Sequence, residues 1–182
     1  YLCRRRHKVV FIAEQNPVFC LRFLPHQKSA CGMENIMEES KKVNIVNAPL
    51  FRDPIYDAPT DPVVIWNNKE KKWWMLYTQR RSSINAIGVA SSDDGSRWLY
   101  RGTLPGLDFE PGHNTFWAPE IIFAEGEYHM YVSYITGVPT DWNWSRHIIH
   151  YTADDLWNWH FESVLSLSSD RVIDACVHPI GN

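Results

Sequence analysis

From residue 61 onward the sequence alternates short apolar and aromatic runs with turn residues, and it shows little helical periodicity. Such runs, bounded by clusters of Gly, Asn, Asp or Ser, are typical of β-strands. A first group of predicted strands lies at 61–66, 73–78, 86–90 and 98–100. A second group lies at 120–123, 128–134, 147–151 and 159–161. The pattern predicts an all-β fold.

The two groups of strands repeat along the chain at a constant spacing. Trp98 of the first group aligns with Trp159 of the second. Tyr100 aligns with Phe161 at the same offset. Self-similarity of this kind, with four strands per unit, indicates the blades of a β-propeller. A third unit opens at 172–177.

Two blades and the start of a third cannot close a ring, because propellers use roughly four to eight blades. The sequence therefore predicts a partial β-propeller of about two and a half blades, from the N-terminal part of such a domain. The expected division is an extension at 1–48 that is poorly ordered or not native, and a propeller part at 49–182 with blade one at about 61–102, blade two at about 117–165 and the start of blade three at 171–182.

The N-terminal arm differs from the rest of the chain in charge. Residues 1–32 hold six basic residues against the single acid Glu14, although the whole chain has a formal charge of −3. The chain begins with Tyr1, and Met33 opens a segment that resembles the N-terminus of a cytosolic protein. Residues 1–32 are therefore expected to be translated sequence upstream of the true start, or a mispredicted extension. The apolar stretch 9–13 is broken at once by polar residues, which argues against a signal peptide. The cellular location is left open by the sequence; a cytoplasmic location is expected if Met33 is the true start.

Three acids lie where the first strand of each predicted blade begins. They are Asp61, Glu120 and Asp174, which follow one another at similar intervals. The first strand of a propeller blade is the innermost, so these side chains are expected to surround one pocket at the central channel. Crowded carboxylates acquire different pKa values, which separates acid from base roles. The alternative is that acids at strand starts are turn residues bonded to the backbone.

These residues resemble a known family of enzymes. Asp61-Pro62, the run 116–120 (Phe-Trp-Ala-Pro-Glu) and the run 173–175 (Ile-Asp-Ala) resemble glycoside hydrolase family 43, whose relatives include the neoagarooligosaccharide hydrolases of family 117. The resemblance covers about residues 50–182 and implies a five-bladed β-propeller that hydrolyses O-glycosidic bonds. It implies that Asp61 is the general base and that Asp174 tunes the pKa of the general acid.

The chain departs from the family pattern at the general acid and at Glu120. The general acid of the family, a Glu opening the fourth blade, has no counterpart in this chain, so the chain alone is expected to be inactive. The family usually has Asp where Glu120 stands, and Glu120 is assigned to the pocket wall or to substrate binding. A loop at the pocket mouth adds His113, Asn114 and Trp117 as substrate-binding candidates, with packing between blades as the alternative for Trp117.

The function expected from these features is a glycosidase that acts with inversion on plant or algal poly- or oligosaccharides containing arabinose, xylose or galactose. The alternatives are a non-catalytic carbohydrate-binding propeller and a retaining, fructosidase-like enzyme with Asp61 as nucleophile. Neither a nucleic acid nor a membrane is an expected partner, and the oligomeric state is open. No cofactor or metal is expected, although a structural cation such as calcium is compatible with the family. The triplet 52–54 (Arg-Asp-Pro) is interpreted as a coincidental likeness to family 32.

Overall fold

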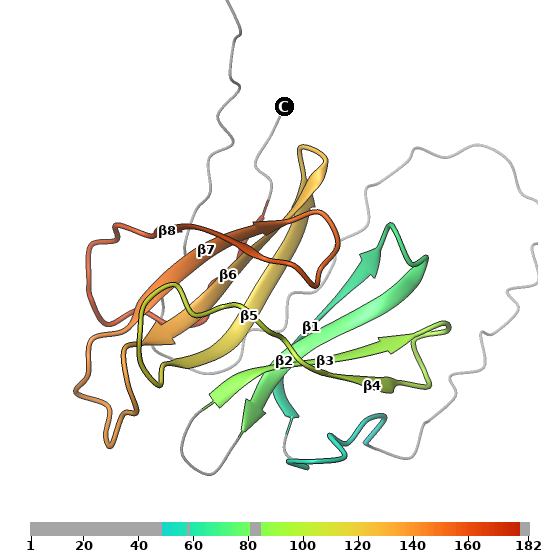
Figure 1. Ribbon diagram of the computed structural model, residues 1–182, viewed down its shortest axis with the longest axis horizontal. Helices are drawn as coiled ribbons and strands as arrows, with labels where there is room; N and C mark the ends of the chain where they lie inside the picture. Colours follow the sequence, from blue (N-terminus) through green and yellow to red (C-terminus); the bar gives the residue numbers. More distant parts are fainter. Residues whose placement is uncertain (1–48, 58, 81–84, 179–182) are drawn as a thin grey trace, which may run out of the picture.

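The structure is a computed structural model that describes residues 49–57, 59–80 and 85–178. These residues form two four-stranded antiparallel sheets and no helix (Figure 1). The first sheet contains β1 (Pro59–Asn67), β2 (Lys72–Arg80), β3 (Asn85–Ser92) and β4 (Leu99–Thr103). The second contains β5 (Thr115–Ala124), β6 (Glu127–Ile135), β7 (His147–Ala153) and β8 (His160–Val164).

In both sheets the strands are adjacent in the order of the sequence, as in propeller blades. The predictions of an all-β chain and of a partial propeller are therefore confirmed. The extension expected at 1–48 lies outside the described residues.

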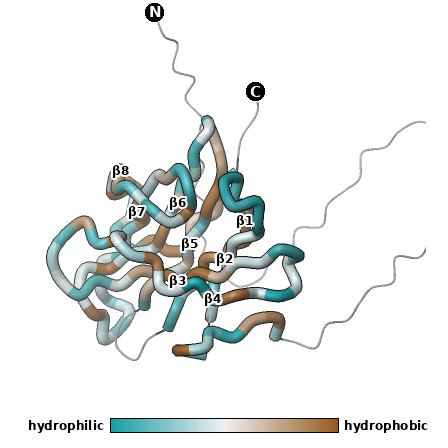
Figure 2. Tube along the Cα trace, turned by 45° about the vertical axis from the view of Figure 1, so that its right-hand side comes forward, coloured by the Kyte–Doolittle hydropathy of each residue, from teal (hydrophilic) through white to brown (hydrophobic). Residues whose placement is uncertain are grey.

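The two sheets pack face to face around one hydrophobic core. Alternate residues of a strand point to opposite faces, so Tyr128, Met130 and Val132 of β6 share the face turned toward the first sheet. Trp74 and Leu76 of β2 meet them from the other side, and all five side chains are buried. Hydrophobic stretches run along strands of both sheets (Figure 2). This packing brings β1 and β5, the innermost strands, into contact.

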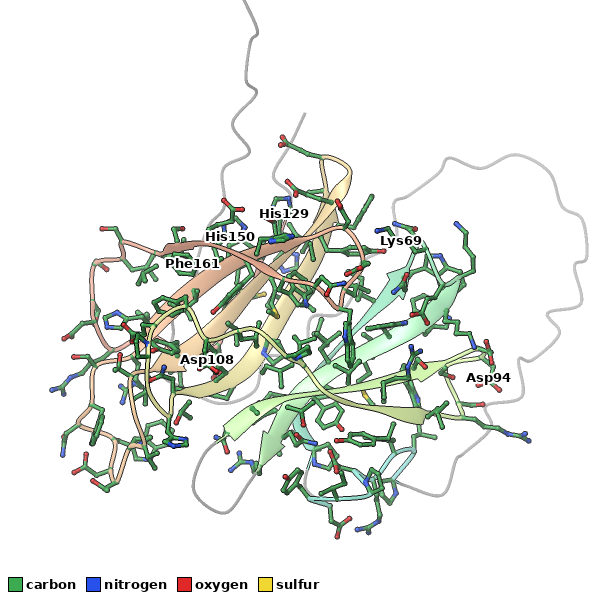
Figure 3. All side chains as sticks on the ribbon, viewed as in Figure 1. Lys69, Asp94, Asp108, His129, His150 and Phe161 are labelled. Atoms are coloured by element: carbon green, nitrogen blue, oxygen red, sulfur yellow. The ribbon has the colours of Figure 1, made fainter. Side chains whose placement is uncertain are left out.

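The repeat seen in the sequence is reproduced by matching hydrogen bonds. The indole Nε1 of Trp98 donates to the Gly95 carbonyl oxygen at 3.1 Å. The indole Nε1 of Trp159 donates to the Leu156 carbonyl oxygen at 3.0 Å. Each bond closes the turn between the third and fourth strands of its sheet. The first of these turns contains Asp94, which is labelled in Figure 3. Trp98 and Trp159, which the sequence repeat aligns, therefore occupy equivalent turns in the two sheets.

Residues 171–178 lie on the outer face of the second sheet, the face turned away from the first. Val172 and Val177 are buried there against Tyr131 and Ile148. This segment forms no strand within the described part of the chain, because a first strand needs a second strand beside it to complete its hydrogen bonds. The segment expected to open blade three is thus packed against the second sheet without forming a strand, and the division into blades stays a prediction.

A buried carboxylate fastens the segment before β1 to the first sheet. Asp53, 2% exposed, accepts hydrogen bonds from the Tyr77 hydroxyl and from Nε2 of Gln79, both at 2.7 Å. It also accepts the backbone amides of Ile55 at 2.8 Å and Tyr56 at 2.9 Å. Burial raises the pKa of Asp53, but these hydrogen bonds outweigh burial and leave the pKa below its usual value.

Gly88 of β3 makes room for the ring of Tyr77. The two residues are paired across β2 and β3, and a Cβ at position 88 would lie 2.4 Å from Cζ of Tyr77. We expect Gly88→Ala to lower the free energy of unfolding by about 1–3 kcal/mol, because overpacking forces neighbouring groups to shift. Urea denaturation followed by circular dichroism measures this loss.

The matched control is Ala86→Gly in the same strand, which changes backbone freedom without a clash and should cost about 0.5–1 kcal/mol. A Gly88→Ala protein as stable as the wild type would contradict the contact between Tyr77 and Gly88.

Candidate active site

The inner strands carry a repeated backbone kink at the end where the predicted acids lie. Asp61 lies in a β-bulge of β1, with a φ of 50°. Ala118 lies in the equivalent bulge of β5, with a φ of 48°. Asp174 has the same left-handed conformation, with a φ of 56°. Bulges re-aim side chains and are common next to functional sites.

A hydroxyl on each second strand holds the kinked residue of the next unit. Oγ1 of Thr78 accepts the backbone amide of Ala118 at 2.8 Å. Oγ of Ser133 accepts the backbone amide of Asp174 at 3.0 Å. Thr78 also donates its own hydroxyl proton to Oδ2 of Asp61 at 2.8 Å. Successive inner segments are thereby fixed relative to one another, which brings Asp61 and Asp174 to the same end of the structure.

One cleft of about 390 Å³ contains both predicted catalytic residues. Asp61 and Asp174 line it together with Trp117, so the structure brings these three predicted residues together. The first sheet adds Thr78, Arg80 and Asn85, and the second sheet with its β6–β7 loop adds Thr115, Ile135, Pro139, Thr140, Asp141 and Trp142. The charged groups among these described residues are three carboxylates and one guanidinium, an excess of acids.

The two predicted catalytic carboxylates influence each other. Partial burial and the negative charge of Asp61 both raise the pKa of Asp174 above its usual value, burial being the larger cause. Like charges in one site disfavour simultaneous ionisation. Asp174 therefore holds a proton more readily than a free aspartate does.

The Asp61 carboxylate is oriented by neighbouring hydroxyls. Oδ2 accepts hydrogen bonds from Thr78 at 2.8 Å and from Oγ1 of Thr60 at 3.0 Å. The Arg80 Nε donates to the Thr60 hydroxyl oxygen at 3.1 Å. Both bonds recorded for Asp61 within the described residues use the same oxygen. Among the described residues, Oδ1 accepts no hydrogen bond.

Glu120 does not line the cleft, although its spacing suggested that it would. The bulge in β5 gives Ala118 the position equivalent to Asp61, and Glu120 follows two residues later. Its side chain lies near residues 177 and 178, where burial raises its pKa and the Val177 amide and the charge of His178 lower it in part. The expectation of three matching acids around one pocket is not met at Glu120, because both strands carry the same bulge and Glu120 takes the position after it, equivalent to Val63 of β1.

His113 and Asn114 lie in a different place from Asp61 and Asp174. Both line a separate cavity of about 210 Å³ beside the loop that joins β4 to β5. Asn114 is 4% exposed; its Nδ2 donates to the Glu110 carbonyl oxygen at 3.2 Å and its Oδ1 accepts the Gly137 amide at 3.0 Å. Asn114 therefore braces two loops, and His113 is exposed at the edge of this second cavity.

Sequence reasoning did not assign Arg80, Asp141 or Trp142 to the site. Asp141 and Trp142 belong to the loop between β6 and β7, where the run 140–146 combines aromatic and charged residues. That unusual composition was the available signal, but it does not reveal which end of the blade the loop occupies. Arg80 ends β2 and carries no comparable signal.

A pair of histidines lies on the outer face of the second sheet. Nδ1 of His129 and Nε2 of His150 are 3.1 Å apart, and Figure 3 shows the two side chains next to each other. The His150 ring also stacks on Tyr131, with ring centroids 4.7 Å apart. Burial, followed by the charge of His129, lowers the pKa of His150. These residues lie outside the cleft.

Neither a metal site nor a membrane span is found in the part of the chain that the structure describes. No group of three or more His, Cys, Asp or Glu side chains within it is placed to hold a metal ion. The same residues include no helix with the length and apolar character needed to cross a membrane.

Several solved structures resemble this chain. The native arabinanase Arb43A of Bacillus subtilis is 18% identical, with a TM-score of 0.47 over 63% of this chain and 38% of its own. A family 117 glycoside hydrolase of the marine bacterium Zobellia galactanivorans is 19% identical, with a TM-score of 0.46 over 58% and 37%. An α-L-arabinanase of Penicillium chrysogenum in complex with arabinobiose is 20% identical, with a TM-score of 0.43 over 63% and 35%.

Families 43 and 117, which the sequence motifs resemble, are both named among the similar structures, family 43 for an endo-arabinanase of Bacillus licheniformis. The chain spans less than two thirds of each, so the activity is argued below from its own residues. No protein-family model and no curated protein matches the chain.

The coupling between the two carboxylates can be measured directly. We expect Asp61→Asn to lower the pKa of Asp174, because the substitution removes one of the two causes that raise it. Carboxyl carbon NMR as a function of pH measures this pKa in both proteins. Asp141→Asn, a substitution of another cleft carboxylate that does not contribute to the raised pKa, is the control. An unchanged Asp174 pKa in the Asp61→Asn protein would show that the two groups are not coupled.

Proposed function

We propose that this chain is part of an inverting glycoside hydrolase and supplies its general base. The observation that carries the proposal is the cleft in which Asp61 and Asp174 meet beside Trp117. An apolar aromatic wall with a few convergent polar groups is the usual composition of a small-molecule site. A pair of carboxylates, in which the pKa of Asp174 is raised, is the kind of arrangement that glycoside hydrolysis uses.

In this proposal Asp61 takes the proton from the attacking water. In an inverting glycosidase, a base activates water on one face of the sugar while an acid protonates the leaving oxygen from about 6.5–9.5 Å away. Asp61 suits the base, because its Oδ2 is held by hydroxyl groups and Oδ1 faces no recorded partner among the described residues. Asp174 serves as the group that tunes and orients the acid. The acid itself is not assigned to a described residue.

The substrate that we propose is a neutral oligosaccharide built from arabinose, xylose or galactose. Trp117, which is 9% exposed and packs with Ala118 and Ile135, still lines the cleft, and the apolar surface that it contributes there suits the carbon–hydrogen face of a sugar ring. Arabinobiose is the ligand named for the Penicillium arabinanase structure and is therefore the first probe to try.

The test uses dinitrophenyl glycosides of arabinose, xylose and galactose. Dinitrophenolate leaves without protonation, so the general base alone should support turnover of these activated glycosides by the full chain, whereas glycosides that need a general acid are expected to stay intact. Proton NMR of the first-formed sugar should show an inverted anomer. Hydrolysis with retention, or no hydrolysis of any of the three glycosides, would refute the proposal.

The same experiment separates the two alternatives. A retaining enzyme would accumulate a glycosyl ester on Asp61, which intact-protein mass spectrometry detects after rapid quenching. A binding propeller would hold the oligosaccharide without releasing dinitrophenolate.

A further inference from the structure

The loop between β6 and β7 carries a solvent-exposed tryptophan, Trp142, at the cleft. Trp142 is 71% exposed, the highest value among the large hydrophobic side chains of the described residues, yet it lines the cleft that contains Asp61 and Asp174. Leaving such an apolar ring exposed forgoes the favourable free energy of burial. Exposed aromatic rings beside a polar cleft often mark a binding surface.

The position of this ring is held by a buried arginine. Arg146 is 7% exposed, and its Nη1 donates to the Trp142 carbonyl oxygen at 2.6 Å. Its guanidinium carbon lies over the Trp142 ring, 5.5 Å from the centroid. A cation over an aromatic face is attracted by the negative charge density of the ring. One face of the ring is thus covered by Arg146, and the other remains open.

Arg146 also connects this loop to the segment that carries Asp174. Its backbone amide donates to the Asp170 carbonyl oxygen at 2.6 Å, and its carbonyl oxygen accepts the Val172 amide at 3.3 Å. Its Nε is buried without a hydrogen-bond partner among the described residues. A guanidinium kept there without an acceptor for Nε is costly to bury, and its contact with Trp142 offsets part of that cost.

We infer that the open face of Trp142 is a stacking platform for a sugar unit next to the hydrolysed one, and that Arg146 is the positioning residue of that platform. The inference rests on the proposed function and extends it to the specificity of the same cleft. Among the described residues that line the cleft, three carboxylates oppose one guanidinium, which favours a neutral sugar over a uronate or a sulfated unit.

The test measures binding, with hydrolysis removed from the readout. In an Asp61→Asn background, arabinobiose, xylobiose and galactobiose are titrated by calorimetry against the full chain. Trp142→Ala should weaken the binding of the preferred disaccharide roughly 2- to 12-fold, which corresponds to the about 0.5–1.5 kcal/mol contributed by an aromatic contact. Trp144→Ala, in the same loop but outside the cleft lining, should leave binding unchanged.

A double-variant cycle separates positioning by Arg146 from a general effect on the fold. Arg146→Met should weaken binding, and the Trp142→Ala/Arg146→Met protein should bind as Trp142→Ala does, because Arg146 acts through Trp142. Arg146→Lys should restore folding but not full affinity, since lysine lacks the planar group. If Arg146→Met does not fold, the Trp142→Ala result decides the inference.

The outcomes distinguish this inference from the proposed function. Disaccharide binding that Trp142→Ala leaves unchanged, or no binding of any of the three disaccharides, overturns the platform. Binding that depends on Trp142, with no turnover of the dinitrophenyl glycosides by the wild-type chain, supports the platform and refutes the hydrolase.

Discussion

Replacing Asp53 with alanine should lower the free energy of unfolding by about 3 kcal/mol or more, because each hydrogen bond to a charged group is worth about 1.5–3 kcal/mol. The substitution removes a charged acceptor from the buried Tyr77 hydroxyl and from Nε2 of Gln79. The backbone amides of Ile55 and Tyr56 lose their acceptor as well, so the segment before β1 should detach from the sheet. Urea denaturation measures the loss.

The loss should depend on pH in a defined direction. The pKa of Asp53 is lower in the folded than in the unfolded chain, so its contribution is complete above the unfolded value of about 3.9 and disappears as pH falls toward the folded value. The control is Asp57→Ala, which removes only an exposed ion pair with Arg52, worth about 0–1 kcal/mol. Equal losses for Asp53→Ala and Asp57→Ala would show that Asp53 does not anchor the segment.

The fold is predictable because each strand carries its own local signal. Apolar runs and turn residues indicate the eight strands and their order. The constant spacing that pairs Trp98 with Trp159 aligns the outer strands correctly, since both indoles close the same turn. The opening of blade three carries the same kind of pattern, but strand formation also requires a neighbour, which a local pattern cannot supply.

The site is only partly predictable, because it depends on register and on long-range contacts. Counting residues places Glu120 with Asp61, but the bulge in β5 gives that position to Ala118. The amide side chain of Asn114 is of a kind that often binds sugar hydroxyls, but here it hydrogen-bonds two loops to each other. The triplet around Asp53 does not reveal its anchoring role, since its partners on β2 lie far away in the sequence.

The largest effect on activity is expected from Asp61→Asn. The asparagine keeps the size of the side chain and can still accept the Thr78 hydroxyl, but it cannot take a proton from water. General-base catalysis contributes typically 10²–10⁴-fold, so kcat on the dinitrophenyl glycosides should fall by about that factor while KM changes little. The assay follows release of dinitrophenolate at saturating glycoside.

The matched control is Asp141→Asn, which neutralises another carboxylate of the same cleft. Oδ1 of Asp141 accepts the Asn143 amide at 2.7 Å within its own turn, so it is not expected to transfer protons. A loss of kcat in Asp61→Asn that Asp141→Asn does not share separates proton transfer by Asp61 from the negative charge of the cleft. Comparable losses in both variants would mean that the carboxylates act through their summed charge, and Asp61 would no longer be the base.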